Sequence, residues 1–390
     1  MSKGSLGLLS AYWPEDTPRH AHIPLKTICD VTIRPIAESA PDRPALVCAN
    51  GTVTYGELRQ RVDRCAGALR GRCKSGTRVV SILDDPAELV VAALGAFEAQ
   101  TLNLLNVESP SQEALSSFAP ELMISGAQET GVASISYAET IALPAVERTQ
   151  RADFRTPLLA LARPDRRGEV VHNHRTLVAT AIAAGAFYML ESDSRVVLLD
   201  PPITWYSLAL MLAAFNRGAT VWTSWGANPS PPPDRADYVV CDWNGAGKFL
   251  GPQPDLRLPS RIGAGAIVAI EGPFSISRRR RIARRLKTPV LTLLGRNDLG
   301  PVLGSHPTWF LDDAAGIPLP NVDTRPLNPA DRTPVSIGWD SVADAELGVR
   351  SALAPAGGDL SEGWLQSGIR CEVDPTGLYY LHGESALRAL

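Results

Sequence analysis

Two histidines and two acids are among the side chains of this sequence that could move protons. His172 and His174 lie in the segment Leu158–Leu177, and Glu271 and Asp298 each follow an apolar run further along the chain. Imidazole and carboxyl groups act as general acids or bases when a reacting group lies within hydrogen-bond reach. No Ser-His-Asp set and no G-x-S-x-G signature supports hydrolysis.

The two histidines follow a segment that reads as a strand, a turn and the start of a helix. An apolar run at 158–161 indicates the strand, polar residues at 163–168 the turn, and a helix is expected from about Arg175. The arginines of the turn could meet an anion. A phosphate cradle, however, needs backbone N–H groups and small residues, whereas Pro164 lacks the N–H and nearby acids repel phosphate. We interpret the turn as an ordinary surface loop.

Metal and thiol chemistry have weaker support. The cysteines are scattered without a C-x-x-C pair: Cys29, Cys48, Cys65, Cys73, Cys241 and Cys371. This spacing does not suit a zinc site, and we expect buried free thiols in a reducing cytoplasm. Cys241 is a potential nucleophile, although a lone buried cysteine is usually inert. His20 and His22 alternate without a third ligand, so no metal site is expected.

The most charged run of the chain is SRRRRIARRLK at 277–287. Ile282 and Leu286 have helical spacing, so one face can pack, and Ser277 can cap the helix. The ordinary interpretation is a solvated face. The functional one is a surface for an acidic partner or a CoA-type phosphate. Its residues would be Arg278, Arg279, Arg280, Arg281, Arg284 and Arg285.

Composition describes an ordinary globular protein. Among 390 residues, 45% are hydrophobic, 20% are charged, and the net charge is −3. Such a balance gives no global attraction to nucleic acid or to a membrane. The longest apolar run, at 178–190, is too short to span a bilayer, and no signal peptide is recognised. We therefore expect a cytoplasmic protein.

Strands alternate with helices through the first half of the chain. Thr54 and Glu57 have capping-box spacing at the start of one helix. Strands are expected at 77–83 and 101–107, with a helix at 88–99 between them. This alternation predicts an α/β fold with parallel, doubly wound sheets, whose ligands bind at the carboxyl ends of the strands.

Several segments, in order, resemble the adenylate-forming superfamily of acyl- and aryl-CoA ligases, luciferases and peptide-synthetase adenylation domains. They are PDRPALV (41–47), TYGEL (54–58), VVHNHRTL (170–177), RGATVW (217–222), GRNDLG (295–300), GIPLPNV (316–322), ELGVRS (346–351) and GWLQSGI (363–369). The resemblance covers residues 27–384. It implies stacked parallel doubly wound sheets with a small distorted β subdomain, which together form the large N-terminal domain of these enzymes.

The resemblance also implies where a site would lie. The four acid–base candidates would converge on the cleft of the large domain. The residues implied to line its ligand pocket are Thr204, Trp205, Tyr206, Cys241, Glu271, Gly272, Leu294, Gly295, Asn297 and Asp298.

The sequence departs from the family at the residues that hold ATP. The phosphate loop lacks its Ser/Thr/Gly core and its lysine. Leu294 replaces a tyrosine, Asn297 a threonine, Asp298 the magnesium-binding glutamate, Ile369 the ribose-binding aspartate, and Glu384 the hinge arginine. The C-terminal lid domain of the family, with its catalytic lysine, is not recognised in the sequence. We therefore expect no cofactor and neither ATP nor magnesium binding.

The sequence is divided into an arm (1–26), a first α/β subdomain (27–228), a second (229–320) and a small β subdomain (321–390) that stops before the family's hinge. The first hypothesis is a non-adenylating protein that binds an acyl or aryl group, or an acidic carrier protein or enzyme of a biosynthetic pathway. The second is an ATP-independent enzyme with new chemistry in the old pocket. A weaker third is a split ligase whose C-terminal domain is a separate chain. Homo-oligomers are compatible with all three.

Overall fold

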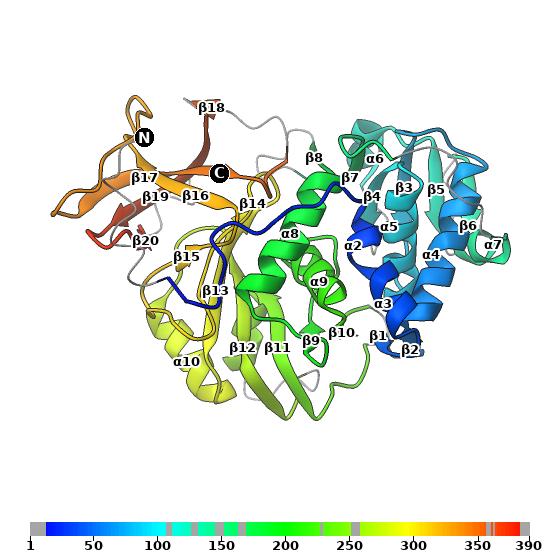
Figure 1. Cartoon of the computed structure of the whole chain (residues 1–390), viewed down its shortest axis with the longest axis horizontal. Helices are drawn as coiled ribbons and strands as arrows, with labels where there is room; N and C mark the ends of the chain where they lie inside the picture. The colour runs from blue at the N-terminus through cyan, green and yellow to red at the C-terminus, as the bar shows by residue number, and fades with distance from the viewer. Residues whose placement is uncertain are drawn as a thin grey trace.

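Three β-sheets organise the chain (Figure 1). The computed structural model describes residues 13–106, 111–125, 132–144, 152–162, 169–226, 229–250, 258–355, 360–361 and 363–382. Within these residues the largest sheet, sheet A, has the strand order β15-β14-β13-β12-β11-β9-β10-β1-β2. The bounds of its strands are β1 Pro44–Cys48, β2 Gly51–Thr54, β9 Arg195–Leu198, β10 Thr220–Thr223, β11 Arg235–Asp242, β12 Arg261–Ile270, β13 Val290–Arg296, β14 Gly300–Gly304 and β15 Ile317–Pro318. The central strands β1 and β9–β13 are parallel, whereas β2, β14 and β15 add antiparallel edges.

Sheet B has the order β6-β5-β3-β4-β7-β8. Its strands are β3 Arg78–Ile82, β4 Leu102–Asn106, β5 Leu122–Ser125, β6 Ser134–Ser136, β7 Pro157–Ala162 and β8 Glu169–Asn173. All pairs are parallel except β7 with β8, which is antiparallel. The segment predicted as strand, turn and helix therefore contains a second strand before its helix. The turn itself, at 163–168, lies outside the described residues.

A smaller sheet, sheet C, follows at the end of the described chain. Its strands are β16 Val322–Leu327, β17 Val342–Ser351, β18 Leu360–Ser361, β19 Trp364–Val373 and β20 Tyr379–Leu381. The pairs are antiparallel, and register shifts distort the pairing of β17 with β19. The expected fold class, two parallel α/β sheets with a small distorted β subdomain, is confirmed.

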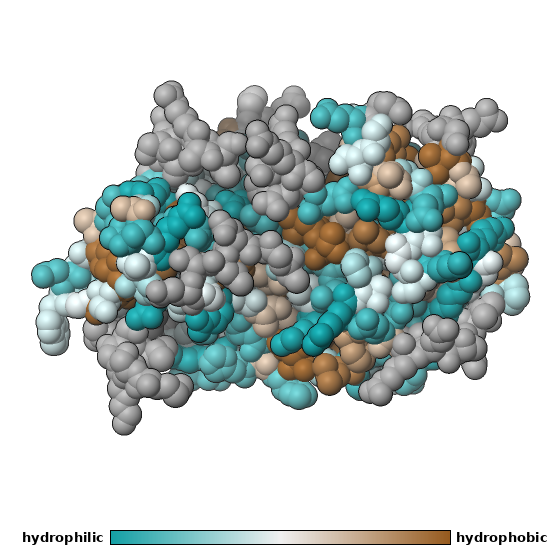
Figure 2. Space-filling model, turned by 90° about the horizontal axis from the view of Figure 1, so that it is seen from above, coloured by the Kyte–Doolittle hydropathy of each residue, from teal (hydrophilic) through white to brown (hydrophobic). Residues whose placement is uncertain are grey.

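Helices fill the space between and around the sheets. They are α2 Ile28–Val31, α3 Ile33–Ser39, α4 Tyr55–Arg70, α5 Pro86–Glu98, α6 Gln112–Phe118, α7 Tyr137–Ala142, α8 His174–Phe187, α9 Trp205–Arg217, α10 Ile276–Leu286 and the 3₁₀ helix η1 Gly245–Leu250. Helices α5, α8 and α9 are buried along almost their whole length and form a central layer (Figure 1). The surface seen in Figure 2 mixes hydrophilic residues with smaller hydrophobic patches.

Alternating side chains give sheet A two packed faces. Val240 and Ile267 belong to the large core that includes α8 and α9. Their neighbours Cys241 and Val268 point the other way, into a cluster with Phe249 of η1 and the α10 side of the sheet. The parallel strands are thus covered on both faces, which is why they read as continuous apolar runs in the sequence.

An extended segment, the arm at 13–26, crosses the molecule in front of α8 (Figure 1). Thr17 Oγ1 lies 2.8 Å from His306 Nε2, and the amide of Asn321 donates to the carbonyl of Arg19 over 2.9 Å. The arm then enters α2, which Thr27 caps. It therefore ties the β14–β16 region to the N-terminal helices.

The predicted helix start at Thr54 is confirmed, because Thr54 and Glu57 make both bonds of a capping box. The predicted cap of α10 is wrong: Ser275, not Ser277, accepts the hydrogen bond from the backbone N–H of Arg278.

The expected boundary at 228/229 falls between β10 and β11, which belong to the same sheet. Sheet A joins strands far apart in sequence, and local patterns carry no information about that order.

One buried carboxylate holds three N-terminal helices together. The Glu98 side chain of α5 is fully buried, and its Oε1 lies 2.9 Å from Arg34 Nη2 of α3 and 3.2 Å from Arg70 Nη2 of α4. Both arginines keep about a fifth of their side chains exposed (23% and 19%), so their charges stay partly solvated. Partial burial of the guanidinium lowers the pKa of Arg34, but the charge of Glu98 and the hydrogen bonds to Asp30 and Glu98 act with other contacts to raise the pKa overall.

We expect Glu98→Gln to lower the free energy of unfolding by about 2–4 kcal/mol, because two arginines lose a buried counter-charge. Urea unfolding followed by circular dichroism measures it. The matched control is Glu38→Gln, which removes an exposed partner of Arg59 and should change stability by less than about 0.5 kcal/mol. Equal effects of the two substitutions would contradict a structural role for the Glu98 cluster.

Candidate functional site

The carboxyl ends of β9, β11, β12 and β13 bring several of the predicted pocket residues together. Trp205 Nε1, at the start of α9, donates to Glu271 Oε1 after β12 over 3.1 Å. The indole also lies against Gly295 of β13, where an added Cβ would come within 2.6 Å of the ring. Gly295 is therefore required by the tryptophan. Beside them, a Cβ added to Gly272 would meet nothing within 4 Å, so the edge keeps open space there.

Glu271 is exposed at this edge, and the pKa of its carboxyl is raised. Partial desolvation of the carboxyl against its neighbours raises its pKa, and the negative charge of Asp298 adds to the effect. The hydrogen bond from Trp205 and the charge of Arg296 oppose the rise. Among the four acid–base candidates, Glu271 is the carboxyl that faces the open edge without an arginine bound to it in the described structure.

Asp298 is bound by a neighbour that the sequence analysis did not single out. Arg296 Nε and Nη2 each donate to one Asp298 oxygen over 2.8 Å, and Nη1 donates to the carbonyl of Ser367 in β19 over 2.7 Å. Both carboxylate oxygens are thus engaged by a guanidinium. A hard cation needs free oxygen ligands. The donor set does not fit magnesium, and no group of three acidic, histidine or cysteine side chains among the described residues is arranged to hold a metal.

His172 connects sheet B to the same turn. Its Nε2 lies 3.2 Å from the carbonyl oxygen of Asn297, so Nε2 carries the hydrogen and donates it. Nδ1 lies 3.4 Å from Thr176 Oγ1. Burial lowers the pKa of His172 to about 4, and the bond to Asn297 only partly offsets this. The ring is neutral at pH 7 and both nitrogens are engaged, which is the arrangement of a structural tie.

His174 is placed away from the site. It begins α8, is fully buried, and its Nδ1 accepts the backbone N–H of Ile28 over 3.2 Å. Its ring meets Phe154 edge-on at 6.5 Å. The alternation of His172 and His174 along the chain therefore sends one ring to the turn after β13 and the other to α2.

Three predicted pocket or nucleotide positions are core residues. Leu294 is fully buried in β13, and Ile369, at the ribose position, is buried in β19. Cys241 belongs to the cluster on the α10 side of sheet A, so its placement in the pocket is corrected. Burial raises the pKa of the Cys241 thiol well above its usual range, which makes it a poor nucleophile. Glu384 lies outside the described residues.

A polar chain lies next to Trp205. Thr204 occupies the N-cap position of α9, and Trp205 packs edge-to-face on Tyr206 at 5.6 Å. Tyr206 donates its hydroxyl to Asp200 Oδ2 over 3.0 Å, and that oxygen also accepts the amide of Asp242. Sequence reasoning missed Asp200, Asp242 and Arg296. The signal for both aspartates was their position directly at or after a strand end.

The arginine run forms α10, and its register decides which arginines are surface. Arg279 is 1% exposed, so its assignment to a partner surface is wrong. It donates to the carbonyls of Val290, Leu311 and Asp312 and to Ser305 Oγ, over 2.9–3.1 Å. Burial lowers its pKa to about 10. Arg279 precedes Ile282 by three residues, so the face that buries Ile282 also buries the arginine.

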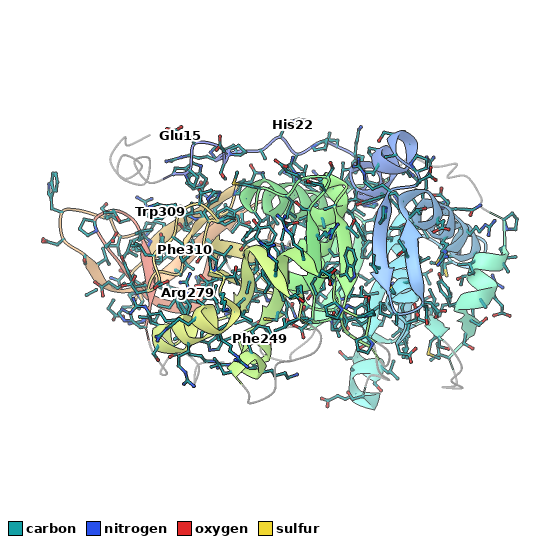
Figure 3. The ribbon with its side chains drawn as sticks, turned by 90° about the horizontal axis from the view of Figure 1, so that it is seen from below. Glu15, His22, Phe249, Arg279, Trp309 and Phe310 are labelled. Atoms are coloured by element: carbon teal, nitrogen blue, oxygen red, sulfur yellow. The ribbon has the colours of Figure 1, made fainter. Side chains whose placement is uncertain are left out.

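The remaining arginines divide into two groups. Arg278 stacks on Trp243 at 4.7 Å and donates to its carbonyl over 2.6 Å. Four are exposed: Arg280, Arg281, Arg284 and Arg285. Figure 3 shows Arg279 between α10 and the sheet, with Phe310 nearby, and the arm with His22 on the opposite side of the molecule. A cavity of about 450 Å³ beside α10 is lined by Arg280, Arg284, Lys287 and Phe310, among others.

The fold is that of the large N-terminal domain of adenylate-forming enzymes, as the resemblance predicted. Residues 34–115 match the sequence model of the AMP-binding enzyme family. Over 63 residues the chain is 40% identical to a 3-hydroxybenzoate–CoA ligase of Aromatoleum sp. (strain CIB), a match that spans 16% of this chain and 12% of that ligase.

Solved structures extend the similarity to almost the whole chain. The N-terminal subdomain of Klebsiella oxytoca NpsA, in complex with 3-hydroxyanthranilyl-AMSN, has a TM-score of 0.76 and 17% identity, and covers 92% of this chain and 100% of that one. A benzoate CoA ligase from Burkholderia xenovorans LB400 has a TM-score of 0.76 and 18% identity, with 93% and 80% covered. An artificially fused adenylation–PCP form of NpsA with ThdA has the same TM-score and identity, with 92% and 73% covered.

No helix in the described part of the chain is long and apolar enough to cross a membrane.

The low pKa of His172 predicts acid sensitivity. Histidine in the unfolded chain has a pKa of about 6.5. Between that pH and the lower pKa of the folded protein, the unfolded chain binds a proton at His172 and the folded chain does not. The contribution of neutral His172 to the free energy of unfolding is therefore complete above pH 6.5. It decreases as the pH falls and stops decreasing near pH 4. We expect the His172 contribution to fall by about 2 kcal/mol between pH 7 and pH 5.

Urea unfolding at pH 7 and pH 5 measures this loss in the wild type and in His172→Asn, which has no ring to protonate. The variant should lose less stability over that interval. His306, whose pKa is also about 4, is present in both proteins and cancels in the comparison. The same loss in both proteins would exclude His172 as its source.

Burial of Arg279 predicts a large cost for its removal. Arg279→Met leaves the carbonyls of Val290 and Asp312 without their donor and should lower the free energy of unfolding by about 3 kcal/mol. Arg281→Met, on the exposed side of the same helix, should change it by less than about 0.5 kcal/mol. Chemical denaturation of the two variants side by side decides whether Arg279 is a core residue.

Proposed function

We propose that this protein is a non-adenylating relative of the aryl- and acyl-CoA ligases, which binds an aryl or acyl group and an acidic partner such as a carrier protein. The observation that carries the proposal is the bidentate pair of Arg296 with Asp298. The position that holds magnesium in the adenylate-forming family is here neutralised from within the chain.

Further substitutions support the loss of ATP chemistry. Ile369 is buried and cannot accept a hydrogen bond from a ribose hydroxyl. Leu294 is a core residue. His172 is tied to Asn297 at the turn where the family contacts phosphate. Catalysis by oriented donors requires groups that remain available to the reacting atoms, and these groups are already satisfied by one another.

The ligand class follows from the similar proteins and from the edge of sheet A. The similar proteins are named for aryl acids or were solved with derivatives of them: 3-hydroxybenzoate, benzoate and a 3-hydroxyanthranilyl compound. In this chain, Trp205 and Tyr206 pack edge-to-face at this edge of sheet A, and Trp205 donates to Glu271, the neighbour of Gly272. Aromatic rings at the edge of the site favour a planar aryl group. We therefore propose a small aryl carboxylate or its thioester as the ligand.

The partner surface is the exposed arginine face of α10. It consists of Arg280, Arg281, Arg284 and Arg285, and Lys287 follows at the end of the helix. One of these charges, Arg280, is paired with Asp312 over 3.0 Å. A single-sign cluster attracts an acidic protein and speeds association. A solved structure of similar fold is the artificially fused adenylation–PCP di-domain of NpsA and ThdA, and this supports a carrier as the partner.

A second function rests on Glu271. Its raised pKa and its position at the open edge, held by Trp205, suit a general acid or base. An ATP-independent enzyme acting on the bound aryl group would use this carboxyl.

Calorimetry and thermal unfolding test the proposed function. We expect no saturable binding of magnesium-ATP at concentrations below about 1 mM, and a clear rise in Tm with 3-hydroxybenzoate or benzoate. Trp205→Ala should weaken the aryl ligand about fivefold or more, because the aromatic ring that holds Glu271 at this edge is lost. The control, Trp339→Ala, removes a tryptophan that is 92% exposed and should leave binding unchanged.

Each outcome separates the alternatives. Tight magnesium-ATP binding would refute the proposal and favour a split ligase. Turnover of an aryl thioester that is abolished by Glu271→Gln would favour the ATP-independent enzyme. Salt-sensitive binding of an acidic carrier protein, lost in an Arg281→Ala, Arg284→Ala, Arg285→Ala triple variant, would establish the α10 surface.

A further inference from the structure

A second cavity lies at the other end of sheet A. It has a volume of about 390 Å³ and is enclosed by the β1–β2 hairpin, α4, the start of α5 and α7. Four strands separate β1 from β13 in the sheet order, which places the hairpin about 24 Å from the Arg296 turn. This cavity is therefore separate from the site at the carboxyl ends of β12 and β13.

Two arginines of α4 lie on the cavity wall. Arg61 and Arg64 are one helical turn apart on α4 and line the cavity. Neither makes an ion pair with a described residue, whereas Arg59 and Arg70 of the same helix do. Both are half-buried, so their guanidinium groups are only partly solvated. A pair of this kind offers a fork of donors to a carboxylate or a phosphate.

The opposite wall carries acids. Asp85 caps α5 through the amides of Ala87 and Glu88 and accepts a bond from Asn50, so its oxygens are engaged. Glu88 lines the cavity without an ion pair to any described residue. Burial raises the pKa of the Glu88 carboxyl, and the charge of Asp85 adds to the rise. Unpaired charges of opposite sign thus face one cavity without meeting across it.

A buried hydroxyl completes the wall. Tyr137 of α7 is 6% exposed, and its hydroxyl has no hydrogen-bond partner among the described residues. Burial raises the pKa of this hydroxyl; the charge of Arg61 opposes the rise and that of Glu88 adds to it. Buried hydroxyls are nearly always satisfied, by protein, water or ligand. This one points to a group that occupies the cavity.

We propose that this cavity binds a zwitterionic small molecule of the α-amino-acid class. Its carboxylate would lie at Arg61 and Arg64, its ammonium at Glu88, and the Tyr137 hydroxyl would bond to the carboxylate. An anion alone would face the charges of Glu88 and Asp85, and a cation alone those of the arginines. A zwitterion satisfies both poles, and the apolar side chains of Val53, Ala87 and Ile141, which also line the cavity, suit an apolar side chain on the ligand.

A thermal-shift screen of the standard amino acids with the full chain identifies the tightest apolar one. Calorimetry then compares a matched set: L-phenylalanine, 3-phenylpropionate, which lacks the ammonium, and 2-phenylethylamine, which lacks the carboxylate. We expect the amino acid to bind at least about tenfold more tightly than either analogue. Arg64→Ala should weaken it by about tenfold or more, and Tyr137→Phe by a few-fold.

Arg59→Ala is the matched control, because Arg59 belongs to the same helix but is engaged by Glu38 and Asp63. It should bind like the wild type. Circular dichroism and the urea midpoint establish that each variant is folded. The proposal is overturned if no amino acid binds at about 10 mM, or if 3-phenylpropionate binds as well as L-phenylalanine. Unchanged affinity in a folded Arg64→Ala protein would also overturn it.

Discussion

The turn after β13 is the point at which the three sheets meet. Arg296, at the end of a sheet A strand, reaches Ser367 in sheet C and binds Asp298 with its remaining donors. His172, from the last strand of sheet B, donates to the carbonyl of Asn297 in the same turn. Three consecutive residues therefore hold the relative positions of the sheets.

The same contacts engage side chains of the candidate site within the protein itself. In a catalytic site, donors and charges are held ready for atoms that arrive with the substrate. Here the guanidinium of Arg296 and the ring of His172 are used inside the protein. The scaffold gains rigidity from interactions that would otherwise be available to a ligand. At the carboxyl ends of β12 and β13, Glu271 remains as a titratable group, next to the open space at Gly272.

The fold was largely predictable from the sequence, and the site only in part. Capping residues such as Thr54 and the apolar strand runs are local signals, so the elements and the fold class followed from them. The strand order of sheet A was not local, and the boundary at 228/229 divided one sheet. The charge of Arg279 indicates a surface residue. Its position three residues before Ile282, however, places it on the buried face of α10. Arg296 was overlooked because its role depends on Ser367, 71 residues away.

The arm at 13–26 has a consequence for the order in which the protein folds. Thr17 bonds to His306 across 289 residues of sequence, and Ala21 to Asn321 across 300. These contacts close some of the longest loops in the chain, and such contacts form late. During synthesis the arm leaves the ribosome early but waits for partners made near the end of the large domain. Docking of the arm therefore requires that the strands of both parallel sheets have already been synthesised.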